Sequence, residues 1–180
     1  CPPADTWINE LSRHGLSTDR VVPLALHVDY WDYIGWKDRF AKPQFTERQQ
    51  LISRRNALGT IYTPQLALNG VVMRRWGDND KLTAALNIVQ EGKPGADLAL
   101  GLQDSAADRL GITASALVHD AKDRANSALF LALYENKLSS EVRAGENRGV
   151  TLRHNYVVRE WIGPLALDAA ASAGVAREIS

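Results

Sequence analysis

The sequence predicts an α/β domain over residues 1–92, followed by an antiparallel β-rich extension over residues 93–180. The first observation is the short, almost continuously apolar and partly β-branched run 21–28, which is typical of a strand covered on both faces of a parallel sheet. The second is the alternation of apolar residues after Pro94, which is typical of antiparallel strands. Because no long linker separates the two parts, we expect them to form one compact unit.

Composition argues against several classes of partner. The 180 residues are 45% apolar and 23% charged, as in ordinary globular proteins. Lys plus Arg and Asp plus Glu both number 21, so no excess of positive charge indicates binding to nucleic acid or to an anionic membrane. No apolar run is long enough to cross a bilayer, so we expect no membrane span.

Three helices are expected in the first part, each marked by apolar residues at helical spacing, at about residues 2–15, 46–59 and 78–90. The second begins at Thr46-Glu47-Arg48-Gln49, which matches a capping box. Before the third, Asn69-Gly70 separates two β-prone runs and predicts a tight hairpin. The order helix, strand, helix, hairpin, helix is that of a thioredoxin fold without its first strand, which we expect immediately before Cys1.

The extension is expected to contain several short strands. Four runs either alternate or are nearly continuously apolar, at residues 98–102, 114–118, 128–134 and 151–161. The last two are separated by the loop 143–149, which has charges of both signs and two glycines. We expect a solvated turn there, with binding of an anion or a partner as the alternative.

Six sequence blocks occur in one order: Cys1-Pro2-Pro3-Ala4-Asp5, His27-Val28-Asp29-Tyr30-Trp31-Asp32, Gly35-Trp36-Lys37-Asp38, Tyr62-Thr63-Pro64-Gln65, Gly145-Glu146-Asn147 and Val157-Val158-Arg159. Together they resemble a bacterial family of secreted, thioredoxin-like proteins catalogued as domain of unknown function 1223. The resemblance covers nearly the whole chain. It implies export to the periplasm or the medium. It also implies that Cys1 is the second cysteine of a Cys-x-x-Cys pair. The first strand of the fold and the first cysteine of the pair are absent from this chain.

Cys1, the only cysteine, is the first candidate for chemistry. At a helix N-terminus, unpaired N–H groups and the helix dipole favour the thiolate and lower the pKa of a thiol. This indicates a thiol–disulfide oxidoreductase, or a relative derived from one, that acts on protein or peptide thiols and disulfides without a cofactor. As it stands, the chain could not complete a dithiol cycle. A structural cysteine and a lipid-modified N-terminal cysteine are the alternatives.

Thr63 and Pro64 are the second candidates, as the wall that faces the substrate. Pro64 precedes the predicted hairpin, and thioredoxin folds have a cis proline at this place, where the neighbouring backbone can pair with a bound strand. We therefore expect a cis Thr63–Pro64 bond. The alternative is an ordinary trans proline at the start of a strand.

The aromatic loop after residue 28 is the third candidate. Tyr30, Trp31, Asp32 and Trp36 could form a rim that binds a peptide, although such aromatics more often pack against helices. This rim supports a rival function, a non-enzymatic module that holds a peptide or an envelope partner.

His27 and Asp29 raise the question of a metal-dependent enzyme. On a strand both would point to one side, near Asp32 and Asp38. No second histidine lies at ligand spacing, however. We therefore expect no metal, and instead a hydrogen-bonded polar cluster that fixes the aromatic loop.

Overall fold

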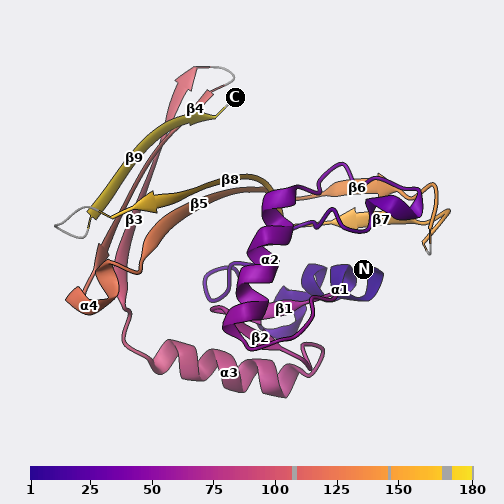
Figure 1. Cartoon of the computed structure of the whole chain (residues 1–180), viewed down its shortest axis with the longest axis horizontal. Coiled ribbons are helices and arrows are strands. Elements are labelled where there is room, and N and C mark those ends of the chain that lie inside the picture. Colours follow the sequence, from indigo (N-terminus) through magenta and orange to yellow (C-terminus); the bar gives the residue numbers. More distant parts are fainter. Residues whose placement is uncertain (107–108, 146, 168–171, 180) are drawn as a thin grey trace. The chain divides into compact units, whose positions relative to one another are not determined.

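The computed structural model describes residues 1–106, 109–145, 147–167 and 172–179 of a mixed α/β chain (Figure 1). Its helices are α1 (Pro2–Asn9), α2 (Pro43–Arg55), α3 (Asn79–Glu91) and α4 (Ala121–Arg124), with short 3₁₀ turns η1 (Leu11–His14) and η2 (Asp32–Ile34). Its strands are β1 (Leu66–Leu68), β2 (Val71–Met73), β3 (Ala96–Ala106), β4 (Arg109–Val118), β5 (Ala128–Glu135), β6 (Leu138–Glu141), β7 (Thr151–His154), β8 (Val157–Ala166) and β9 (Ser172–Ile179).

The chain divides into two units. Unit 1 comprises Cys1–Glu91 and Leu133–Glu160, and unit 2 comprises Gly92–Ala132 and Trp161–Ser180. The expected boundary near residue 92 coincides with the end of α3. Residues 133–160, however, group with the N-terminal segment rather than with the rest of the extension. Close packing of the two units as one body stays a prediction.

The core of unit 1 joins α1, α3 and the β1–β2 hairpin. Leu11, Leu16, Leu82 and Leu86 are buried together, and Leu68 of β1 packs against them. This burial follows from helical spacing, which puts apolar residues on one face of each helix. The expected hairpin and third helix are thus confirmed.

The hairpin turn has the backbone that its sequence favours. Asn69 and Gly70 both have positive φ, 46° and 81°, as a tight two-residue hairpin turn requires. The register pairs Leu66 with Met73 and Leu68 with Val71.

The capping-box prediction for α2 is wrong. The helix begins at Pro43, not at Thr46, because a proline fits the first helical position, where its missing N–H costs nothing. Thr46 lies in the first turn, and its hydroxyl donates to Asp29 Oδ1 at 2.6 Å. It therefore links the helix to the aromatic loop instead of capping the helix.

The run 21–28 is not a buried strand, contrary to prediction. It forms one parallel bridge, from Ala25 to Val157 of β8. Val22 is 63% exposed and Leu24 is 41% exposed. A strand of a parallel sheet is buried when it has neighbours on both sides and cover on both faces. Among the described residues this segment has one bridge, to β8 at Ala25, and its other long-range backbone contact is the single bond from the Lys42 N–H to the His27 carbonyl oxygen, which forms no second strand pair.

Unit 2 contains antiparallel strands in the order β3-β4-β9. Ala114 and Ala116 of β4 are buried with Leu129 of β5. Gly163 of β8 is needed where β8 approaches β5, because a Cβ there would lie 2.8 Å from the Leu129 carbonyl oxygen. The antiparallel β-rich extension is therefore confirmed in this unit. Strands β6 and β7, which also pair antiparallel, belong to unit 1.

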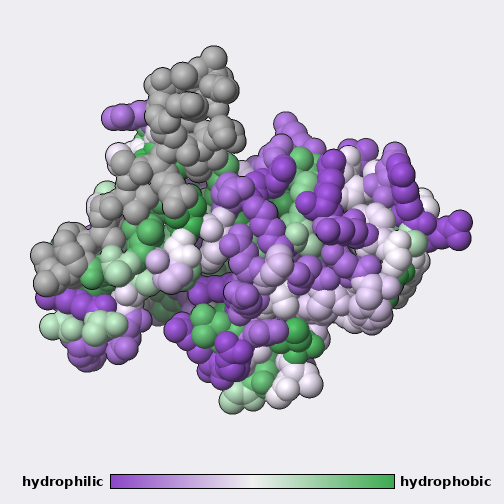
Figure 2. Space-filling view, turned by 45° about the horizontal axis from the view of Figure 1, so that its top comes forward, coloured by the Kyte–Doolittle hydropathy of each residue, from purple (hydrophilic) through white to green (hydrophobic). Residues whose placement is uncertain are grey.

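Apolar side chains also reach the surface among hydrophilic ones, as Figure 2 shows for one face of the molecule. Three of the most exposed, Leu98, Leu100 and Leu102, alternate along β3. Within the described ranges, no helix is both long and apolar enough to cross a membrane.

Candidate active site

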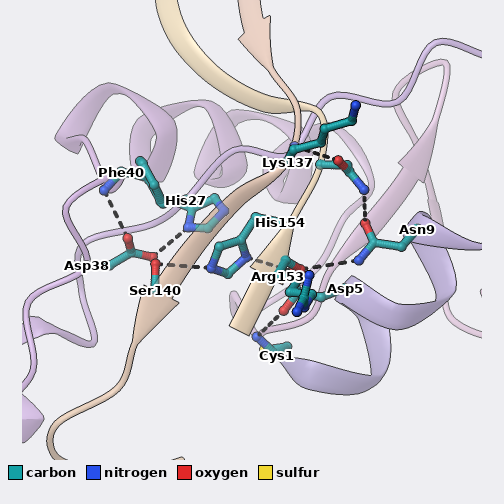
Figure 3. Close-up of polar contacts among 11 residues, drawn as sticks. Cys1, Asp5, Asn9, His27, Asp38, Phe40, Lys137, Ser140, Arg153 and His154 are labelled. Carbon is teal, nitrogen blue, oxygen red and sulfur yellow. Dashed lines mark hydrogen bonds and ion pairs between the residues drawn. The ribbon is translucent and has the colours of Figure 1, made fainter. Parts of the chain in front are cut away.

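Two imidazoles, one buried and one half-buried, meet in unit 1 (Figure 3). His27, from the segment before the aromatic loop, and His154, at the end of β7, have ring centroids 5.1 Å apart in an edge-to-face arrangement. His154 is 3% exposed. Strand β7 brings it there because Leu152 and His154 share the inward face of the strand.

Each imidazole contacts a carboxylate. His27 Nδ1 lies 2.5 Å from Asp38 Oδ2, and His154 Nδ1 lies 3.4 Å from Asp5 Oδ1. His154 Nε2 also lies 3.2 Å from the hydroxyl of Ser140 on β6. The chain of contacts therefore runs from helix α1 through β6 and β7 to the aromatic loop.

The network reaches Cys1 at its α1 end. The terminal nitrogen of Cys1 donates to Asp5 Oδ2 at 3.3 Å. Cys1 is the N-cap of α1, and its carbonyl accepts the N–H groups of Ala4 and Asp5. The thiol is free and the residue is exposed. Cys1 thus lies at the start of the helix, as expected, and next to a half-buried acid that contacts a buried histidine.

The two carboxylates share one electrostatic pattern. Burial acts to raise the pKa of Asp5, but the hydrogen bond to His154 and the nearby ammonium of Cys1 outweigh it, so this pKa lies below its ordinary value of 3.8. Burial likewise acts to raise the pKa of Asp38, and the hydrogen bond and charge of His27 hold it below 3.8. Both acids are therefore ionised at neutral pH.

Phe40 covers the imidazole pair. It is 3% exposed, and its ring meets His27 and His154 edge-on at 5.6 and 5.8 Å. The guanidinium groups of Arg39 and Arg159 lie over the same ring, at 4.6 and 5.3 Å from its centroid.

The aromatic loop meets the Thr63–Pro64 wall. The Thr63–Pro64 bond is cis, as expected. Trp31 Nε1 donates to Thr63 Oγ1 at 3.0 Å. Trp31 is 43% exposed, and its ring stacks on Tyr33 and contacts Tyr30, with centroids 6.3 and 5.3 Å apart.

Gln49 of α2 also contacts the residues before Pro64. Its Nε2 donates to the Tyr62 carbonyl oxygen at 2.8 Å, whereas its Oε1 is buried without a hydrogen bond of ordinary geometry. The hydroxyl of Tyr30 is likewise buried without a hydrogen bond of ordinary geometry. Burial raises the pKa of Tyr30, and the neighbouring Gln49, Thr63 and Trp31 side chains oppose that rise only in part.

The acids of the loop fix its backbone. Asp29 accepts from Thr46, and Asp32 Oδ1 accepts from the Asp38 N–H at 3.3 Å. Together with the His27–Asp38 contact, this is the hydrogen-bonded cluster expected from the sequence. Asp29 and His27 contact different partners, so they do not act as a pair. Trp36 is half-buried.

Comparison with known proteins gives one family. Residues 1–179 match the model of the family described as "Protein of unknown function (DUF1223)". The chain belongs to this family. The family description assigns no activity, and no curated protein matches the chain.

One solved structure resembles this family member. It is the X-ray crystal structure of a protein from Agrobacterium tumefaciens, with 22% sequence identity and a TM-score of 0.60. The match covers 98% of the present chain and 71% of the Agrobacterium protein. Identity this low supports a shared fold and nothing about activity.

Two blocks of the DUF1223 chain that lie far apart in sequence are neighbours in unit 1. A Cβ at Gly35 would lie 3.5 Å from Ala144, and one at Gly145 would lie 3.1 Å from Ile34 Cδ1. Ala144 and Gly145 therefore pack on the end of the aromatic loop. Glu146, which belongs to this block, lies outside the described residues.

Sequence reasoning did not identify His154, Ser140 or Gln49 as members of these clusters. The alternation in Thr151–His154 was the available signal for His154, since it predicts an inward side chain. Within the described ranges, no group of three or more His, Cys, Asp or Glu side chains is arranged to hold a metal ion.

Proposed function

We propose that this protein carries a thiol–disulfide exchange site of thioredoxin-like type, with Cys1 as the thiol and Thr63–Pro64 as the wall that faces the substrate. Substrates are extended segments of other polypeptides that carry a thiol or a disulfide. The thiolate of Cys1 attacks a substrate disulfide, one sulfur of which leaves as a thiolate, and a mixed disulfide with Cys1 remains.

The observation that carries this proposal is the position of Cys1. Its thiol is free and the residue is exposed at the start of α1, where the helix dipole favours a thiolate. Asp5, one turn further along α1, accepts from the terminal nitrogen of Cys1 and contacts His154. These features together are uncommon for a merely structural cysteine, which is usually buried and inert.

The order of elements supports a thioredoxin-like fold. Helix α1, the extended segment 21–28, α2, the β1–β2 hairpin and α3 follow one another as they would in that fold without its first strand. The hairpin directly follows Pro64, and Trp31 holds the Thr63 side chain beside it.

A peptide whose cysteine is activated as a mixed disulfide with a coloured aromatic thiol tests the proposal. The folded protein is expected to release the coloured thiol at least about fivefold faster than the urea-unfolded chain at pH 7, because the helix terminus raises the thiolate fraction. Mass spectrometry should find the peptide on Cys1, and Cys1→Ser should abolish the product. Equal rates for folded and unfolded protein would remove Cys1 as an activated thiol.

A non-enzymatic peptide-binding module is the second candidate. The exposed, stacked rings of Trp31 and Tyr33 beside Thr63 favour it, because aromatic faces bind extended peptides without any thiol chemistry. Peptide binding that is unchanged in Cys1→Ser, together with no covalent product from the intact protein, would favour this function over the exchange reaction.

We also propose a periplasmic or secreted location, which the family resemblance supports. Fractionation of a bacterium that expresses the intact protein tests this: the protein should appear in the periplasm or the medium, and recovery with the cytoplasmic markers would contradict it.

A further inference from the structure

The backbone before Pro64 is held from two sides by side chains of distant segments. Gln49 of α2 donates to the Tyr62 carbonyl oxygen at 2.8 Å, and Trp31 of the aromatic loop donates to the Thr63 hydroxyl at 3.0 Å. Both donors are N–H groups directed at adjacent residues, 62 and 63. The segment before Pro64 is therefore fixed although it belongs to no strand.

Gln49 also lies beside the aromatic loop. Its Oε1 and the Tyr30 hydroxyl are both buried. The hydrogen bond between the Gln49 and Tyr30 side chains acts to lower the pKa of Tyr30 against the effect of burial. The Gln49 side chain is therefore held between Tyr30 and the Tyr62 carbonyl oxygen.

The main chain of Thr63 is available for pairing. Within the described ranges, neither its N–H nor its carbonyl group makes a backbone hydrogen bond. A main chain without backbone partners can pair with an extended peptide, provided that its peptide planes are already oriented. Fixing those planes in advance lowers the entropy that binding must offset.

We infer that Gln49 is a positioning residue of the substrate wall: with Trp31 it orients the backbone of Tyr62 and Thr63 so that the wall accepts extended peptides in preference to small disulfides. The expected effect on disulfide exchange rests on the proposed function, whereas the expected effect on peptide binding does not. Gln49 contacts Tyr62 rather than the substrate, so its effect is indirect.

The first test compares a peptide disulfide with a small disulfide, bis(2-hydroxyethyl) disulfide, as substrates. Gln49→Met keeps the side-chain volume and removes the N–H donor. In single-turnover formation of the mixed disulfide, we expect the peptide concentration that gives half the maximal rate to rise about five- to tenfold, with the maximal rate constant nearly unchanged. The rate with the small disulfide should stay within about twofold of the wild-type rate. The matched control is Gln50→Met, since Gln50 is the next residue of α2 and its side chain is exposed.

A second measurement separates this inference from the proposed function. Fluorescence anisotropy of a labelled extended peptide, with serine in place of its cysteine, reports binding without thiol chemistry. Gln49→Met and Trp31→Phe should each weaken this binding about five- to tenfold, whereas Gln50→Met should not. Trp31→Phe keeps a smaller aromatic ring and removes the donor to Thr63, so it provides a second variant if Gln49→Met fails to fold.

Two results would overturn the inference. One is unchanged peptide binding in both Gln49→Met and Trp31→Phe, each shown to be folded by circular dichroism. The other is an equal loss of rate with the peptide and the small disulfide in Gln49→Met, which would indicate general damage to the fold. If the wild-type protein binds the peptide but reacts with neither disulfide, the exchange function fails and the positioning role of Gln49 is still measured by binding.

Discussion

Two half-buried carboxylates, Asp5 and Asp38, are expected to determine how the stability of unit 1 depends on pH. Their pKa values in the folded protein lie below the ordinary 3.8, since burial is outweighed by contacts with His154 and His27. A depressed pKa stabilises the folded state above the unfolded value and loses that effect as pH falls through the folded value. We therefore expect the free energy of unfolding to decrease below about pH 4.

Urea unfolding followed by circular dichroism at pH 7 and pH 3 measures this dependence. Asp38→Asn removes one titrating group, so the difference in free energy of unfolding between the two pH values should be smaller than in the wild type. The same difference in both proteins would show that the His27–Asp38 contact contributes nothing to acid sensitivity.

His154 is expected to contribute strongly to stability. It is 3% exposed, and its two ring nitrogens contact Asp5 and Ser140. His154→Ala leaves a cavity and two buried polar groups without their partner, and we expect it to lower the free energy of unfolding by about 2–4 kcal/mol. His119 on the surface of unit 2 is the control: its contacts with Asp97 and the Pro94 carbonyl oxygen are exposed, so His119→Ala should cost less than about 1 kcal/mol. Equal effects of both substitutions would contradict a structural role for the imidazole pair.

The positions of single residues were partly predictable. Cys1 and Thr63-Pro64 carry local signals, a helix start and a proline before a hairpin, and both lie where these signals place them. The contact between His27 and His154 was not predictable, because nothing local in the sequence relates His27 to β7. The contact forms only when β7 is folded against α1 and the aromatic loop.

Asn56 joins α2 to the β1–β2 hairpin. Its Oδ1 accepts from the Val72 N–H at 2.9 Å, and its Nδ2 donates to the Gly70 carbonyl oxygen at 2.8 Å. Asn56→Ala removes both bonds, and we expect a loss of about 1.5–3 kcal/mol in the free energy of unfolding. Asn87→Ala, on the exposed side of α3, is the control and should not destabilise the protein, since alanine favours helices. Similar losses in both variants would contradict the linking role of Asn56.

Local sequence patterns predicted the elements that are determined by interactions between residues close in the sequence. Asn69-Gly70 determines its own turn, and the apolar spacing of α3 determines its buried face. The run 21–28 differs, because its burial depends on neighbouring strands, and only Ala25 bridges to Val157. The start of α2 was misplaced because Pro43 is better suited to the first helical position than Thr46 is to the cap.

Unit 1 is discontinuous, and its second segment supplies part of the candidate site. Ser140, His154 and Val157 all come from Leu133–Glu160. A fragment of residues 1–92 therefore lacks the bridge to Ala25 and one of the two imidazoles. We expect this fragment to lack the cooperative urea unfolding of the full chain, and its amide NMR spectrum to be poorly dispersed. A well-dispersed spectrum would show that the first 92 residues fold alone.

The sequence predicted the mixed α/β class and the family, because both follow from patterns along the chain. It did not predict which segments form each unit, since Leu133–Glu160 groups with residues beyond the expected boundary through long-range contacts. The activity stays a proposal, because the family description and the solved relative assign none.

The pKa of the Cys1 thiol tests the central claim most directly, because Cys1 is the only cysteine and alkylation reports it without ambiguity. The rate of alkylation by iodoacetamide is measured against pH for the folded protein and for the urea-unfolded chain. We predict a lower thiol pKa in the folded protein, by about one unit or more, because α1 stabilises the thiolate. An equal or higher pKa in the folded protein would contradict the claim that Cys1 is an activated thiol.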